Sequence, residues 1–224
     1  MGSSSEWRND LSDIFEEVDE EVRKDKYSQL WQKYGNWFVS CAVALLLLAV
    51  GYVQWQKYDF EQRAQSSTEF IAALRLIDSK KPEEATRALA GLAESGTKGY
   101  AILAKFRAAG LKVQAGDSAS ASEIYDAIAD DDEVNTLYRD LARLYAIMQR
   151  VDDGDTSELS TELRKLLSDD NPWRFSAREM AAVLALRQRD TKTAREYFKM
   201  LTDDPSTPTG LRQRASEMLQ AIDE

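Results

Sequence analysis

The hydrophobic pattern of the chain separates one uniformly apolar stretch from a long series of amphipathic segments. The 23 residues from Tyr34 to Gln56 include no charged side chain. The centre of this stretch, residues 37–55, contains 19 residues and as a helix would span about 29 Å, the thickness of the hydrocarbon layer of a bilayer. Tryptophan and tyrosine residues flank it on both sides, as they do at membrane interfaces. We therefore predict a transmembrane helix over residues 37–55.

Two other interpretations of the apolar stretch are a cleaved signal peptide and a buried helix of a soluble domain. A signal peptide has a short basic leader, whereas nine of the 36 residues before position 37 are acidic. No small-residue cleavage pattern follows, because Val53, Gln54 and Trp55 are bulky. A buried helix of a soluble domain would be shorter and amphipathic. The membrane interpretation is therefore favoured.

The segment before the predicted span, residues 1–36, is acidic and carries one amphipathic pattern. Between Asp10 and Gln32 four apolar residues recur at helical spacing on an otherwise acidic surface: Ile14, Phe15, Val18 and Val22. This pattern predicts a helix that is either simply solvated or a docking site for a partner. Four basic residues lie within about 20 positions before the span and three after it, which favours a cytoplasmic N-terminus.

Residues 60–224 contain an internal repeat of paired helices. Polar turns recur with spacings of 36, 38 and 35 residues, at Lys80-Lys81, Gly116-Asp117, Gly154-Asp155 and Arg189-Asp190. Apolar residues lie at offsets 5, 9 and 12 after each turn: Ala85, Leu89, Leu92, Ala121, Tyr125, Ile128, Leu159, Leu163, Leu166, Ala194, Phe198 and Leu201. The aspartates of the turns can cap the helices that follow. We predict an all-α fold in which one transmembrane helix precedes an α-solenoid of about four helical hairpins and a C-terminal helix.

The turn, the alanine at offset 5 and the aromatic residue at offset 9 resemble the tetratricopeptide consensus over about residues 60–222. The likeness is degenerate, because Lys105, Arg143 and Arg178 stand where that family has an early tryptophan. Leucines also replace the second-helix alanine and aromatic residue in the third unit. With its acidic leader and single apolar helix, the whole architecture resembles the bacterial ancillary subunits of the Sec translocon and the related repeat domain of cell-division coordinators.

This resemblance implies a single-pass protein of the bacterial inner membrane with a cytoplasmic N-terminus and a periplasmic repeat domain. It also implies two partners, the Sec translocon and a membrane-bound periplasmic chaperone of the prolyl-isomerase type. We expect a cytoplasmic acidic segment over 1–36, the transmembrane helix over 37–55 and a tetratricopeptide-like repeat domain over 56–224. The predicted function is a membrane-anchored scaffold that links the translocon to chaperones for exported proteins. The alternatives are a scaffold for cell division or envelope assembly and a tethered adaptor that faces the cytoplasm.

Composition and charge narrow the chemistry of this protein. The chain of 224 residues has a net charge of −10, no histidine and a single cysteine, Cys41, inside the predicted span. These counts exclude histidine-based catalysis and an internal disulfide, and the negative charge argues against nucleic acid as a partner. The acidic run at 152–155 does not fit an EF-hand, because Gln149 stands where its first aspartate is required. We predict a protein that is not an enzyme and has no cofactor and no metal site.

Basic residues that recur with the repeat, together with one tryptophan, are the candidate protein-binding residues. They are Lys105, Arg139, Arg143, Trp173, Arg174 and Arg178, and Arg212 continues the basic series. In a stacked solenoid equivalent positions align, so the cations could form a stripe for an acidic segment of a partner. The alternative is that they pair with neighbouring carboxylates or are solvated. The tryptophan is either an exposed binding anchor or a staple at the start of a helix.

The third unit has the clearest apolar stripe of the repeat region. It consists of Leu137, Leu141, Leu144, Tyr145 and Met148, which recur at helical spacing. We predict that this face of the helix belongs to the hydrophobic core.

Overall fold

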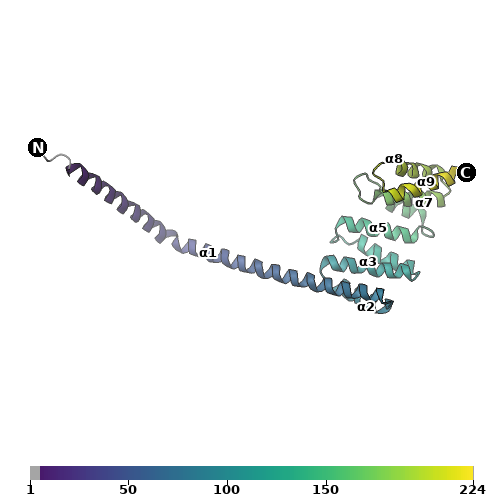
Figure 1. Cartoon of the computed structure of the whole chain (residues 1–224), viewed down its shortest axis with the longest axis horizontal. Helices are drawn as coiled ribbons and strands as arrows, with labels where there is room; N and C mark the ends of the chain where they lie inside the picture. The colour runs from purple at the N-terminus through teal and green to yellow at the C-terminus, as the bar shows by residue number, and fades with distance from the viewer. Residues whose placement is uncertain (1–5, 224) are drawn as a thin grey trace. The chain divides into compact units, whose positions relative to one another are not determined.

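The structure, a computed structural model, describes the backbone of residues 6–223 and the side chains of residues 33–222, except those of residues 35 and 42. Every secondary-structure element within this described range is a helix (Figure 1). The helices are α1 (Glu6–Asp78), α2 (Pro82–Ser95), α3 (Lys98–Gln114), α4 (Ser118–Ala129), α5 (Thr136–Arg150), α6 (Thr156–Arg164), α7 (Arg174–Arg187), α8 (Thr191–Asp203) and α9 (Thr209–Asp223). The predicted all-α class is confirmed.

The chain forms two units, one that ends at Glu61 and a compact one that covers Gln62–Glu224. In the first unit, the large side chains of the apolar stretch are exposed, including the four leucines at 45–48. Among the described residues, this is the one helix that is long and apolar enough to cross a membrane. The predicted amphipathic pattern between Asp10 and Gln32 lies outside the described side chains, although the backbone there is helical.

The compact unit is a series of helical hairpins (Figure 1). The C-terminal part of α1 packs against α2 and α3 around Ala73, Leu89 and Ala104. Helix α3 then pairs with α4, α5 with α6 and α7 with α8, and α9 packs against α8. This is the predicted solenoid of four hairpins followed by a C-terminal helix.

Small and large apolar residues alternate at fixed positions in the core of the solenoid. All twelve residues at offsets 5, 9 and 12 after the turns are at most 5% exposed, which confirms the predicted repeat. The alanines at one equivalent position of α3, α5, α7 and α9 are each at most 1% exposed: Ala104, Ala142, Ala177 and Ala215. Side chains as short as a methyl group let neighbouring helices approach closely, and the larger residues fill the spaces beside these contacts.

Three of the four hairpin turns end their first helix in the same way. Lys80, Gly116 and Arg189 adopt the left-handed conformation, with φ of 57°, 76° and 61°. In each turn the following residue donates its backbone N–H to a carbonyl oxygen five residues earlier at 2.9 Å, which is the long bond of a Schellman motif. Asp117 and Asp190 then accept a backbone N–H from the first turn of the next helix, as their sequence positions predict.

The turn between α5 and α6 differs, although it also contains the Gly-Asp pair. The N–H of Gly154 donates to the carbonyl oxygen of Arg150 at 2.8 Å. A Cβ atom on Gly154 would lie 2.7 Å from that same oxygen, so the glycine permits a close backbone approach. Asp155 caps α6 by accepting the backbone N–H groups of Ser157 and Glu158.

The predicted core stripe of the third unit is wrong at four of its five positions. The structure buries Leu144 only. The other four residues are half-buried or exposed: Leu137, Leu141, Tyr145 and Met148. The buried face of α5 is completed by Ala142, Ala146 and Ile147. Helix α5 therefore carries more apolar surface than its neighbours cover.

Glycine substitutions at the left-handed turns test this local architecture. We expect Lys80→Gly and Arg189→Gly each to raise the free energy of unfolding by about 0.5–1 kcal/mol, because glycine adopts positive φ without a steric cost. Gly116→Ala should lower it by about 1 kcal/mol. Urea denaturation of the full chain, followed by circular dichroism, measures these changes. Lys199→Gly inside α8 is the matched control and should destabilise, since glycine disfavours a helix interior. Loss of stability in both turn variants would contradict the prediction.

Candidate protein-binding surface

An exposed apolar strip runs along one face of α5 and continues onto α7. It consists of Tyr138, Leu141, Tyr145, Met148, Trp173 and Met180, and we call these six residues the apolar strip. Its four members on α5 are three, four and three residues apart, which places them on one helix face. Tyr138 and Met148 are 40% and 42% exposed. Exposed clusters of large apolar side chains mark interaction sites on soluble domains.

A hollow of about 210 Å³ lies within the strip, between α5, α7 and α9. Leu141, Met148 and Met180 contribute apolar surface to it. On its α9 side the Nε of Arg214 lies 2.7 Å from a carboxylate oxygen of Glu179. The hollow therefore combines an apolar lining with one ion pair, and it has room for an apolar side chain of a partner.

Aromatic packing holds Tyr145 in place at the centre of the strip. Its ring centroid lies 5.3 Å from that of Tyr125 and 6.2 Å from that of Phe106. These tilted and edge-on contacts connect α5 to α3 and α4. Tyr145 therefore presents its exposed edge from a fixed position, which lowers the entropy that a partner must remove on binding.

Trp173 both fastens α7 to α5 and contributes to the hollow. Its indole N–H donates to the carbonyl oxygen of Leu137 at 2.9 Å, and its backbone N–H donates to the side chain of Asn171 at 2.8 Å. The Asn171 amide in turn donates to Asp140 at 2.9 Å. The ring is half-buried against the core cluster that contains Leu163. These contacts fit the interpretation of Trp173 as a staple at the start of a helix, and its role as a binding anchor stays a prediction.

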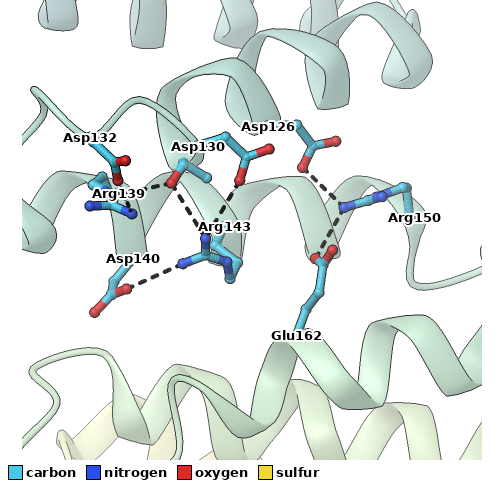
Figure 2. Close-up of polar contacts among 9 residues, drawn as sticks. Asp126, Asp130, Asp132, Arg139, Asp140, Arg143, Arg150 and Glu162 are labelled. Carbon is cyan, nitrogen blue, oxygen red and sulfur yellow. Dashed lines mark hydrogen bonds and ion pairs between the residues drawn. The ribbon is translucent and has the colours of Figure 1, made fainter.

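The predicted basic residues of α5 turn toward the loop that precedes the helix. Arg139 lies 3.0 Å from Asp132, and Arg143 lies 3.8 Å from Asp130 (Figure 2). Both guanidinium groups also donate to the carbonyl oxygen of Ala129, at the end of α4. Positive charge at that position complements the negative end of the helix dipole.

The basic residues of α7 repeat this arrangement one hairpin later. Arg178 lies 2.5 Å from Asp169 and 3.8 Å from Asp204, which are in the loops around α7 and α8. The guanidinium carbon of Arg174 lies 4.1 Å from the centre of the Phe175 ring. The two contacts of Arg178 connect α7 to the loop before it and to the residue that follows α8.

The recurring cations are thus held in separate local contacts. Arg143 and Arg178 are each only 12% exposed at the side chain. Arg212 donates to three backbone carbonyl oxygens between α8 and α9. Lys105 is half-buried on α3, and among the described residues no ion pair involves it. The role of these residues in binding a partner stays a prediction.

A cluster that the sequence reasoning missed surrounds Arg150 at the end of α5. Its guanidinium lies 3.1 Å from Asp126 on α4 and 3.3 Å from Glu162 on α6 (Figure 2), and 3.7 Å from Glu158. Three carboxylates therefore share one cation. Burial raises the pKa of Asp126 and of Glu162, although Arg150 opposes this shift. The sequence signal for this cluster was the spacing around the turn at Gly154. Arg150 lies four residues before that glycine, and Glu158 and Glu162 lie four and eight residues after it.

Residues 28–204 match the model of a protein family described as tetratricopeptide repeat-like domain. The matched range covers well over half of the 224 residues. It includes the apolar stretch of α1 and extends through α8, so it contains all four hairpins. Comparison with curated proteins gives no match, and neither does comparison with solved structures.

Removing the cation of the Arg150 cluster should make stability depend more strongly on pH. We expect Arg150→Gln to lower the free energy of unfolding at pH 7 by about 1–3 kcal/mol, because half-buried carboxylates lose their partner. The folded-state pKa values of Asp126 and Glu162 already lie above the ordinary values of 3.8 and 4.5, and the substitution raises them further. Acidification from pH 7 through these raised values protonates the folded state preferentially, so the deficit should shrink.

Urea denaturation of the full chain between pH 7 and about pH 4.5 measures this deficit. Arg87→Gln is the control, because Arg87 is an exposed arginine on α2 and no ion pair or hydrogen bond is seen for it among the described residues. It should change stability little at any pH. A deficit for Arg150→Gln that stays constant with pH would refute this account of the cluster.

Proposed function

The chain belongs to the tetratricopeptide repeat-like domain family, and on that basis we propose that it is a membrane-anchored scaffold that binds other proteins. The observation that carries the proposal is the apolar strip on α5 and α7. Its tyrosine, tryptophan and methionine side chains are types enriched in protein interfaces. Tyr138, Tyr145 and Met148 are exposed, and Trp173 and Met180 are half-buried beside them, so the strip has apolar surface available for a partner.

The mechanism is tethering rather than chemical transformation. The apolar stretch of α1 is the anchor, with its leucines at 45–48 facing lipid. Anchoring confines the repeat domain to the membrane and raises its effective concentration around membrane-bound partners. The apolar strip then selects a partner by its shape and by the apolar surface that both molecules bury.

The proposed partners are the Sec translocon and a membrane-bound periplasmic chaperone of the prolyl-isomerase type, and the proposed location is the bacterial inner membrane. Support comes from the resemblance of the whole architecture to the ancillary translocon subunits. The excess of basic residues before the span supports a cytoplasmic N-terminus and a periplasmic repeat domain. In that setting the protein helps exported proteins by holding a chaperone beside the translocon.

Two substitutions in the apolar strip test the binding surface. We expect Tyr138→Ser and Met148→Ser each to reduce cross-linking of the full chain to the translocon in intact membranes by about tenfold, because each removes an apolar contact with the partner. Thermal unfolding should barely change, since both side chains are exposed. Met200→Ser is the matched control, because Met200 is a 50% exposed methionine on α8. Equal cross-linking yields for all three variants would show that the strip does not bind the translocon.

Protease treatment of spheroplasts tests the orientation. We expect external protease to degrade the repeat domain in intact spheroplasts and to spare the N-terminal segment, because the charge bias places the latter in the cytoplasm. Immunoblotting with antibodies against each segment follows the result. Protection of the repeat domain until the membrane is lysed would contradict the periplasmic location and favour an adaptor that faces the cytoplasm.

A further inference from the structure

Two hollows lie beside even-numbered helices of the solenoid. The first hollow, of about 330 Å³, lies between α4 and the end of α5, and the second, of about 360 Å³, lies between α6 and α8 over α7. Seven of the eight residues that line the first hollow have a counterpart in the second hollow at the same offset from a hairpin turn. Ser122 and Ser160, for example, both lie six residues after a turn glycine. The two hollows are therefore equivalent sites of successive repeats.

The chain places a charged side chain on the wall of the first hollow. Arg150 extends between α4 and α6 and meets Asp126, Glu158 and Glu162, as Figure 2 shows for the first and the last of these. The cation lies among three carboxylates from the two flanking helices. The chain therefore supplies its own cation beside this hollow, and each of the three carboxylates has Arg150 as an ion-pair partner.

The second hollow keeps none of these four residues. Ala185 replaces Arg150, Arg164 replaces Asp126, Thr193 replaces Glu158, and Tyr197 replaces Glu162. The second hollow therefore has no arginine at the position of Arg150. Its wall carries the cation Arg164 where the first hollow has the anion Asp126.

The lining of the second hollow is suited to an anion attached to an apolar chain. Arg164 is its one charged residue, and among the described residues no carboxylate pairs with it. Its guanidinium donates only to the hydroxyl of Thr161, at 2.8 Å. Leu163 and Leu184 contribute apolar surface at the base. A positive, carboxylate-free hollow in a chain of net charge −10 complements a negative ligand.

We propose that the second hollow binds an acidic side chain, glutamate or aspartate, of a protein partner. That side chain would occupy the place that Arg150 has in the first hollow, with the charges exchanged. Its carboxylate can pair with Arg164 and accept hydrogen bonds from the hydroxyls of Thr193 and Tyr197. Its methylene groups and an apolar neighbour would rest on Leu163. The site is separate from the apolar strip, so the proposal does not depend on partner binding there.

The test uses the full chain in lipid nanodiscs and methyl NMR signals of its alanines and leucines. The probe is the peptide acetyl-Gly-Leu-Glu-Leu-Gly-amide, and two matched peptides carry glutamine or lysine at the centre. We expect the signals of Ala185 and Leu163 to shift with the glutamate peptide. Its affinity should exceed that of the glutamine peptide by about tenfold, and salt should reduce the difference.

Four variants distinguish binding in the second hollow from binding elsewhere on the chain. Arg164→Glu should lower the affinity for the glutamate peptide at least about tenfold. Lys199→Glu, a charge reversal at the equivalent exposed position of α8, should leave this affinity unchanged. Ala185→Leu fills the hollow and should also abolish the shifts. Met148→Ser should have no effect, which separates this site from the apolar strip. Equal affinity for the three peptides, or no shift up to about 10 mM, would overturn the proposal.

Discussion

The contact on which the solenoid depends is the close approach of helices at buried alanines. Ala104, Ala142, Ala177 and Ala215 lie at equivalent points of successive odd-numbered helices, and each is at most 1% exposed. A bulkier residue there would separate two helices and expose the leucines and aromatic residues packed beside them. Because the contact recurs, each hairpin stacks on the previous one in the same register, and every other position of the repeat inherits that register.

The repeat also explains how this domain acquires distinct surfaces. Once the register is shared, a substitution at one position of one repeat alters a single place in the stack. The apolar excess of α5 leaves Tyr138 and Met148 uncovered. In the same way, Ala185 at the position of Arg150 leaves the second hollow without the cation that lines the first. Specific sites arise here from departures from the repeat.

Several acidic side chains of the repeat domain lie where arginines of neighbouring helices can pair with them. Carboxylates in the connections between hairpins meet arginines on the next odd-numbered helix, as Asp130 meets Arg143 and Asp169 meets Arg178. Arg139 and Arg143 also donate to the carbonyl oxygen of Ala129 and so compensate the negative end of α4. The apolar stretch of α1 takes no part in this balance, because it contains no charge between Tyr34 and Gln56.

The sequence by itself determined the apolar helix, the four turns, the aspartate caps and the twelve buried positions, because each depends on local spacing along the chain. It could not decide which apolar residues of α5 are buried, since Leu144 and Tyr145 are adjacent and only the neighbouring helices distinguish them. The direction of each arginine was equally undetermined, because its carboxylate and carbonyl partners lie on other elements. Those choices were made by the tertiary structure, where packing of distant segments decides what is covered and what remains exposed.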